Sequence, residues 1–425
     1  MNNLNKEILV YAGWQGLNGP CLMGTLFSSR LRGKEVFQFE YDPVWLKNEW
    51  TFQIDPDLGR FTGRQFPASE KGLFGVFLDS MPDRWGRQLM LRREAMIARE
   101  EGRSPRQLME SDYLLGVYDL QRLGALRFKL YGEECFLNDD RQLAVPPMSS
   151  LRKLEHACME IEETADDQLA IKWLNMLMAP GSSLGGARPK AGVIDHSGML
   201  WIAKFPSKND DSDQGAWEMI ANEIGNNAGL MMASGKLMKL GSSHHTYLSK
   251  RFDRTPSGER LHFASAMTLL QRNDGDDFST GASYLELAEF LMQYGAQPDS
   301  DLEELWRRIV FSICIKNTDD HLRNHGCILT RDGWKLSPAY DINPNPYGMG
   351  LRLNISENDN SLDLDLARSL CRFFRLNISR AEEIIRQIVQ AVALWRQIAG
   401  KYKLSKNEMD FMSQAFITGT DPRET

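Results

Sequence analysis

Several features are missing from this chain of 425 residues, and each absence excludes a class of protein. No apolar run approaches the roughly 20 residues of a membrane-spanning helix, and Met1–Val10 lacks the basic start and apolar core of a secretion signal. Neither secretion nor membrane insertion is therefore expected. The six cysteines are scattered without a C-x-x-C pair, so we predict no zinc site, no disulfide framework and a reducing, cytoplasmic location.

Positive charge is in short supply as well. The 50 Lys and Arg residues are outnumbered by 57 Asp and Glu residues, which gives a net charge of −7. Surfaces that bind nucleic acid need an excess of basic side chains, so we expect any association with DNA to be indirect, through a partner. The chain also lacks the Walker spacing G-x4-G-K-[ST] and, although residues 273–277 are acidic, the residue order of an EF-hand loop.

The patterns that are present predict an α+β protein whose length requires two or three lobes. Strands are expected in residues 7–41, and a strand hairpin is expected from Lys190 to Phe205. Helices are expected at residues 73–99, 151–178, 284–294, 302–315, 381–399 and 407–416. A polar, proline-containing stretch near residue 147 reads as a linker and gives the first domain boundary. We predict three domains, at residues 1–147, 148–255 and 256–425.

The most informative stretch is the polar run Lys316–Asn324, which follows an apolar helical pattern and predicts a loop. A hairpin should follow, with its turn at residues 331–333, and should return Asp341 to the side of Asn324. Together with Asp319, these side chains would form an oxygen-rich pocket. Such a pocket suits Mg2+, which takes few protein ligands and completes its shell with water and phosphate oxygens.

The order Asp319, Asn324, hairpin, Asp341 repeats the order of catalytic and metal-holding residues in protein kinases. There, too, the catalytic-loop Asp stands five residues before an Asn that holds metal. The strings His-Arg-Asp and Asp-Phe-Gly are both absent here, and the plain alternative is a polar surface loop whose Asp and Asn side chains cap turns. The second Asp and the hairpin argue against that alternative.

Two more kinase-like features precede this stretch. Residues 181–190, Gly-Ser-Ser-Leu-Gly-Gly-Ala-Arg-Pro-Lys, have glycines that let backbone N–H groups approach an anion, besides hydroxyls and a cation; a flexible connection is the plain alternative. Lys204 lies in the second strand of the hairpin, where a kinase places the lysine that holds the phosphates, although it could also face outward. Glu218, with Glu223 as second choice, is the candidate partner of Lys204.

Taken together, these motifs resemble the HipA family, bacterial serine/threonine kinases that act as toxins of toxin–antitoxin pairs. The resemblance covers most of the chain and rests on motifs in the family's order: Pro82–Arg87, Arg122–Phe128, Ala203–Pro206, Tyr247–Arg254, Asn317–Gly326 and Leu336–Ile342. It implies a two-lobed, protein kinase-like α+β fold. An N-terminal α+β subdomain, residues 1–147, would precede the kinase module. The module would consist of a small nucleotide-binding lobe at residues 148–255 and a mostly helical, catalytic C-terminal lobe at residues 256–425.

The resemblance also implies cofactors, site residues and partners. ATP and Mg2+ would be bound, with Asp319 as the catalytic residue and Asn324 and Asp341 as metal ligands. The ATP-binding residues would be Lys204, Glu218, Gly185, Gly186, Ser249, Lys250, Arg251 and Phe252. The site of autophosphorylation would be Ser183, or alternatively Ser182. From the residues alone, His321 and His325 have the i, i+4 spacing of zinc ligands on a helix, but a loop is expected there and zinc needs a third ligand. His321 is therefore expected to support the catalytic loop by hydrogen bonds. The partners would be a HipB-like helix-turn-helix antitoxin and a protein substrate such as an aminoacyl-tRNA synthetase.

The chain departs from the family in two places. Arg188-Pro189 stands before Lys190 where the best-known loop has Gln-Glu, and Asp320 stands where glycine is usual; both changes could alter substrate choice. Two other functions stay open: a non-catalytic kinase-fold subunit that binds ATP and an antitoxin, and a magnesium phosphohydrolase with Asp319 as nucleophile. ATP hydrolysis or autophosphorylation would exclude the first, and phosphate trapped on Asp319 would indicate the second.

Overall fold

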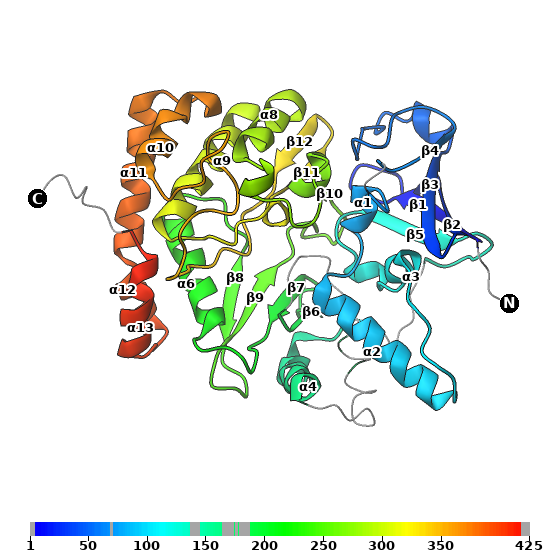
Figure 1. Ribbon diagram of the computed structural model, residues 1–425, viewed down its shortest axis with the longest axis horizontal. Helices are drawn as coiled ribbons and strands as arrows, with labels where there is room; N and C mark the ends of the chain where they lie inside the picture. Colours follow the sequence, from blue (N-terminus) through cyan, green and yellow to red (C-terminus); the bar gives the residue numbers. More distant parts are fainter. Residues whose placement is uncertain are drawn as a thin grey trace, which may run out of the picture. The chain divides into compact units, whose positions relative to one another are not determined.

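The computed structural model describes residues 5–68, 71–136, 145–163, 174, 177 and 188–417. Its contacts group into two compact units, whose elements are labelled in Figure 1. The first unit comprises Met1–Asn209, Leu240–Ser242 and Lys250–Gln271, and the second comprises Asp210–Lys239, Ser243–Ser249 and Arg272–Thr425. The boundaries predicted near residues 147 and 255 both fall inside the first unit.

The first unit contains a five-stranded antiparallel sheet of order β4-β3-β2-β1-β5. Its strands are β1 (Asn5–Ala12), β2 (Cys21–Leu31), β3 (Lys34–Tyr41), β4 (Arg64–Gln65) and β5 (Leu126–Leu130). Alternate side chains of β1, at Ile8, Val10 and Ala12, are fully buried, so one face of the sheet covers the core. The strands predicted in residues 7–41 are confirmed as β1, β2 and β3.

The helices of the same unit are α1 (Gly75–Leu78), α2 (Arg84–Glu100), α3 (Glu110–Leu115), α4 (Leu151–Glu163) and α7 (Ala266–Leu269). The helical stretch predicted at residues 73–99 is interrupted between α1 and α2. The interruption has a local cause, because Pro82 cannot donate a helical hydrogen bond and Asp83 caps the next helix. The Asp83 side chain accepts a hydrogen bond from the Gly86 N–H at 2.8 Å.

The hairpin predicted from Lys190 to Phe205 is confirmed as β6 (Lys190–Ile194) and β7 (Leu200–Lys204), which pair antiparallel. Its turn is closed by Asp195, whose Oδ1 accepts hydrogen bonds from the N–H groups of Ser197 and Met199 at 2.9 and 3.0 Å. The first unit also contains the short strand β10 (Phe263–Ser265).

The second unit is mainly helical. Its strands are β8 (Gly235–Met238), β9 (Thr246–Lys250, within this unit as far as Ser249), β11 (Gly326–Thr330) and β12 (Gly333–Leu336). Its helices are α6 (Gln214–Asn227), α8 (Tyr284–Tyr294), α9 (Pro298–Cys314), α10 (Leu364–Ser369), α11 (Ile378–Ala393), α12 (Trp395–Lys401) and α13 (Lys406–Met412). Strand β8 pairs antiparallel with β9, and β11 pairs antiparallel with β12.

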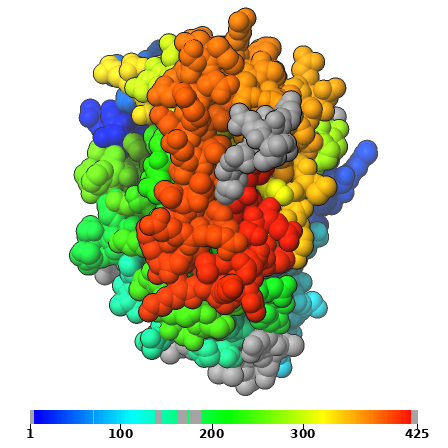
Figure 2. All heavy atoms as spheres, turned by 90° about the vertical axis from the view of Figure 1, so that its left-hand side faces the viewer, coloured from blue at the N-terminus to red at the C-terminus, as the bar shows by residue number. Residues whose placement is uncertain are grey.

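Helix α9 runs through the core of this unit, with Trp306 and Ile309 fully buried, as the apolar period predicted. A second apolar cluster contains the Trp217 ring of α6, whose centre lies 6.2 Å from that of Trp395, and the Trp395 and Phe416 rings stack at 4.5 Å. Figure 2 shows α11 to α13 as an orange-to-red band over one face. Within the described residues, no helix combines the length and the apolar character needed to cross a membrane.

Candidate functional site

The predicted catalytic loop begins where α9 ends. Lys316 has a φ of 47°, a left-handed conformation that stops the helix after Cys314, and the Asn317 N–H donates to the Ser312 carbonyl at 2.9 Å. Residues 317–321 are turn and coil, and a single 3-10 turn, Leu322–Asn324, leads into β11. The loop predicted for residues 316–324 is therefore confirmed.

The Asp319 side chain is exposed, whereas Asn324 is only 6% exposed. The Asp319 carbonyl accepts hydrogen bonds from Asn324 Nδ2 and from the His321 N–H, both at 3.0 Å. Because Nδ2 of Asn324 is engaged in this way, the hydrogen-bond pattern assigns its Oδ1 to the opposite side of the amide, where it can face a cation. The Asp319 carboxylate is thus exposed to solvent, while the Asp319 backbone is held by hydrogen bonds from His321 and Asn324.

Asp341 is returned to this loop by the β11–β12 hairpin, as predicted. On one side of it, the Tyr340 hydroxyl donates to the Arg323 carbonyl at 2.7 Å. On the other side, the Asn343 N–H donates to Asn317 Oδ1 at 3.1 Å. Residues on both sides of Asp341, Tyr340 and Asn343, are therefore hydrogen-bonded to the predicted catalytic loop. The paired part of the returning strand ends at residue 336.

Asp341 itself has a left-handed backbone, with a φ of 55°, a conformation that is uncommon outside glycine and that Asp and Asn adopt more readily than other residues. Its Oδ1 accepts a hydrogen bond from Asn343 Nδ2 at 3.1 Å. Among the described residues, no group of three or more His, Cys, Asp and Glu side chains is placed to hold a metal ion. The oxygens of Asp341 and Asn324 are of the type that Mg2+ takes, and Mg2+ needs few protein ligands; that these two residues hold Mg2+ stays a prediction.

Asp320, the neighbour of Asp319, is buried and has a structural role. The Tyr284 hydroxyl donates to its Oδ2 at 2.6 Å, and His325 Nε2 lies 3.0 Å from its Oδ1. Burial alone would raise the pKa of Asp320, but the His325 ring and the Tyr284 hydroxyl outweigh it and hold that pKa below its usual range. Sequence reasoning missed Tyr284, because a tyrosine at the first position of a helix carries no signal of a buried hydrogen bond.

Glu218 lies on α6 and is 6% exposed. Burial raises the pKa of Tyr247 well above its usual value, and the negative charges of Glu218 and Asp341 raise it further. Both carboxylates therefore lie within electrostatic range of the same phenol. Glu223, the second choice in the sequence, instead forms an ion pair with Lys401 at 3.1 Å. This arrangement favours Glu218 over Glu223 as the acid near the predicted site.

Lys204 is half-buried at the end of β7 and belongs to the first unit. Glu218 belongs to the second unit. The ion pair between them stays a prediction.

The family resemblance predicts a hinge at Ser249–Phe252, whose backbone would hold adenine. The side chains of these four residues differ in burial and in the contacts that they make. Ser249 and Lys250 end β9 and are half-buried, and Phe252 packs its ring 5.6 Å from that of Phe263. Arg251 is 3% exposed; its Nε donates to Asp253 at 2.6 Å, and its N–H donates to a carbonyl of β7. Its side chain is structural, so adenine recognition would fall to the backbone of the neighbouring residues.

Most of the predicted glycine-rich loop lies outside the described residues, including Ser182, Ser183, Gly185 and Gly186. Lys190, its last residue, is described, and its Nζ lies 2.8 Å from Asp83 Oδ2, with both side chains at most 3% exposed. Lys190, one of the two cations of this loop, is therefore part of an internal ion pair. Through this pair, the first residue of β6 is joined to the N-cap of α2.

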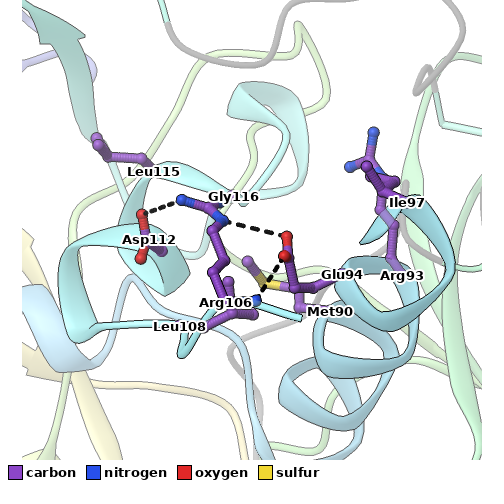
Figure 3. Close-up of a pocket in the computed structure, with 9 residues that line it drawn as sticks. All are labelled: Met90, Arg93, Glu94, Ile97, Arg106, Leu108, Asp112, Leu115 and Gly116. Carbon is purple, nitrogen blue, oxygen red and sulfur yellow. Dashed lines mark hydrogen bonds and ion pairs between the residues drawn. The ribbon is translucent and has the colours of Figure 1, made fainter. Parts of the chain in front are cut away.

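A cavity of 340 Å3 in the first unit lies between α2, α3 and the segment that joins them, as Figure 3 shows. Arg106 spans its edge, with Nε 3.1 Å from Glu94 Oε2 and Nη1 3.5 Å from Asp112 Oδ1. The lining residues are Met90, Arg93, Glu94, Ile97, Arg106, Leu108, Asp112, Leu115 and Gly116. None of these nine is a predicted site residue.

Two curated proteins resemble parts of the chain. A segment of 124 residues is 28% identical to "Putative kinase" of Haemophilus influenzae, and one of 158 residues is 32% identical to "Putative kinase Y4dM" of Sinorhizobium fredii. These matches cover 27% and 34% of this chain. They span 36% and 37% of the length of the two relatives.

Among solved structures, a chain in the complex of the Shewanella oneidensis MR-1 toxin–antitoxin system HipA, HipB and its operator DNA is similar, with a TM-score of 0.65. The similarity covers 96% of this chain and 94% of that chain at 17% sequence identity, and it confirms the predicted α+β, HipA-like fold class. Residues 182–395 match the family model of the HipA-like C-terminal domain. Since that match spans half of the chain, the protein belongs to the family with a HipA-like C-terminal domain.

Proposed function

We propose that this protein is an ATP-dependent serine/threonine kinase of the HipA toxin type. The observation that carries the proposal is the catalytic loop: an exposed Asp319 five residues before a buried Asn324, with Asp341 fastened to the same loop. Phosphoryl transfer depends almost entirely on positioning and on charge stabilisation by groups in this order. The names of both curated relatives also contain the word kinase.

Each residue then has a role in the proposed reaction. Asp319 orients the acceptor hydroxyl and accepts its proton, for which an exposed position is needed. Asn324 and Asp341 hold Mg2+, which supplies positive charge to the phosphates of ATP. Lys204 contacts the phosphates, and Glu218 orients Lys204.

The proposal is tested by incubating the purified protein with ATP labelled in the γ-phosphate and Mg2+. Label that resists hydroxylamine, as on serine or threonine, and that disappears in Asp319→Asn, supports a kinase. Hydroxylamine-labile label on Asp319 itself would overturn the kinase in favour of a phosphohydrolase. No consumption of ATP at all would favour a non-catalytic, ATP-binding subunit.

We further propose autophosphorylation of the glycine-rich loop at Ser183, with Ser182 as the alternative. A phosphate there adds a charge of about −1.5 to −2 where the phosphates of ATP would bind, so the modified protein should bind ATP poorly. Ser183→Ala should prolong activity, and Ser183→Asp should weaken ATP binding. Mass spectrometry of protein made with and without intact Asp319 checks this; no Asp319-dependent phosphate on either serine contradicts the regulation and leaves the kinase proposal standing.

The proposed partners are a small HipB-like antitoxin and a protein substrate such as an aminoacyl-tRNA synthetase. The similar chain of Shewanella oneidensis comes from a complex with HipB and operator DNA, and the net charge of −7 favours contact with DNA through such a partner. Co-purification with the products of the neighbouring genes tests the antitoxin. Phosphoproteomics after induction of the protein identifies the substrate.

A further inference from the structure

We propose that residues 345–350, which follow Asp341, form the docking surface for the acceptor segment of the protein substrate. In this docking segment, Tyr347 and Met349 select an apolar residue close to the acceptor hydroxyl. The inference rests on the proposed kinase function and adds a substrate class to it.

The docking segment is attached to the residue that precedes the catalytic carboxylate. Asn345 Nδ2 donates to Thr318 Oγ1 at 2.7 Å. Gly348 approaches the same side chain so closely that a Cβ on it would lie 2.4 Å from Thr318 Cγ2, so position 348 has to be glycine for this contact. Through Thr318, the segment is thus a structural neighbour of Asp319.

The backbone of the docking segment is fixed by its own hydrogen bonds. Asn345 Oδ1 accepts from the Tyr347 N–H at 3.0 Å, and the Asn345 carbonyl accepts from the Gly348 N–H at 3.2 Å. The Leu351 N–H then donates to the Asn360 carbonyl at 2.8 Å. A surface that is ordered before binding loses less conformational entropy when a partner docks, which suits a recognition element.

The docking segment exposes two large apolar side chains. Met349 is 91% exposed, the highest value among the large apolar residues of the described chain, and Tyr347 is 73% exposed. The Tyr347 ring contacts the ring of Phe411 at 5.4 Å, and Phe411 is itself 39% exposed. Neighbouring exposed apolar side chains mark interaction sites more often than single ones do.

The substrate's acceptor segment is the occupant that this position predicts. For transfer, the acceptor hydroxyl has to come within hydrogen-bonding reach of Asp319, and an extended chain advances about 3.3–3.6 Å per residue. Residues within about three positions of the acceptor therefore pass the docking segment, which is joined to Thr318. Because methionine is flexible and adapts to many shapes, we expect a broad preference for Leu, Ile, Met and Phe at one such position.

The test uses peptides with a fixed central serine and one randomised position at a time, ATP labelled in the γ-phosphate, Mg2+ and the full-length protein. Wild-type protein should favour apolar residues at one position near the serine. In the double variant Tyr347→Ala/Met349→Ala this preference should disappear, and kcat/KM for the best peptide should fall about tenfold, as expected for a lost apolar contact. The KM for ATP should stay unchanged.

Further variants sharpen the result. Met349→Lys should replace the apolar preference by one for Asp and Glu at the same position, and this variant keeps the test valid if Tyr347→Ala impairs folding. Phe61→Ala, which removes a 56% exposed apolar side chain from the first unit, is the matched control and should change nothing. The docking inference would be overturned, and the kinase proposal left standing, by either of two results. One is phosphorylation of peptides by the wild-type protein without a preference for apolar residues; the other is an apolar preference that persists in the double variant. Absence of any Asp319-dependent transfer would overturn the kinase proposal and this inference with it.

Discussion

The hinge segment of the first unit (residues 250–262) and the catalytic loop of the second (residues 316–326) hold irregular backbone in place by different means. In the hinge segment, Asp253 is 1% exposed and contacts two arginines. Arg251 Nε donates to Asp253 Oδ1, and Arg254 Nη1 lies 2.7 Å from Asp253 Oδ2. In the catalytic loop, backbone groups and amide side chains make most of the contacts, and Asp319 is left exposed.

The difference agrees with the roles that we propose for the two segments. The arginines around Asp253 also donate to carbonyls of residues 120–124, so the charges join two remote segments and each buried charge has several partners. Buried charges without such partners would destabilise the fold. The role that we propose for Asp319, exchange of a proton with a substrate, requires a carboxylate that is not bound to a cation. The loop leaves Asp319 exposed, while its buried neighbour Asp320 contacts Tyr284 and His325.

The largest effect on stability should come from the hinge segment. Asp253→Ala leaves two buried guanidinium groups without their carboxylate and should lower the free energy of unfolding by about 3–5 kcal/mol, as measured by urea denaturation at pH 7. Asp299→Ala, which removes one partner of an exposed ion pair with Arg375, is the control and should change it little. Equal stability of both variants would show that the buried charges do not hold the hinge segment.

The same type of change in the catalytic loop should leave stability intact and remove activity. Asp319→Asn keeps the Asp319 carbonyl and its two hydrogen bonds but loses the proton acceptor, so phosphoryl transfer should fall by about 10²-fold or more, the scale of general-base catalysis. The measurement pairs transfer rates with ATP binding and urea denaturation, which should both match wild type. Full activity in this variant would exclude Asp319 as the catalytic residue.

A smaller effect on nucleotide binding is expected from Asp341. Asp341→Ala removes one of the two proposed ligands of Mg2+, so the affinity for ATP should fall about tenfold or more in Mg2+. In EDTA the variant and the wild type should bind ATP alike. A loss of the same size in both conditions, read by calorimetry, would mean that Asp341 is needed for the shape of the loop.

Regular elements and the catalytic loop were predictable because their signals are local. Helix α8 has the predicted bounds, since Ser283 and Glu286 form a capping box at its start. The spacing of Asp319 and Asn324, followed by a hairpin signal, was sufficient to predict the loop and the hairpin that follows it. Each of these signals lies within a short window of sequence.

Contacts between remote segments were not predictable in this way. Asp253 accepts a hydrogen bond from the Gly124 N–H, 129 positions away, and Asp320 accepts one from Tyr284, 36 positions away. The sequence does not distinguish a buried Asp or Arg from an exposed one, and these residue types are mostly exposed in folded proteins. For the same reason, the sequence contains no sign of the buried ion pair between Lys190 and Asp83.

The smallest effect should come from the hydrogen bond that holds Asp320. Because the pKa of Asp320 is held below its usual value, its ionised form stabilises the folded protein above pH of about 4, and this stabilisation is lost as the pH falls through the lowered pKa. Tyr284→Phe removes a charge-assisted hydrogen bond worth about 1.5 kcal/mol at pH 7 and lets the pKa rise towards its usual value. The loss of stability in Tyr284→Phe should therefore shrink as the pH falls, since a protonated Asp320 needs this donor less.

Urea denaturation at a series of pH values checks this trend, with the exposed Tyr131→Phe as control. A loss of stability that stays constant with pH would assign the effect to packing of the Tyr284 ring instead.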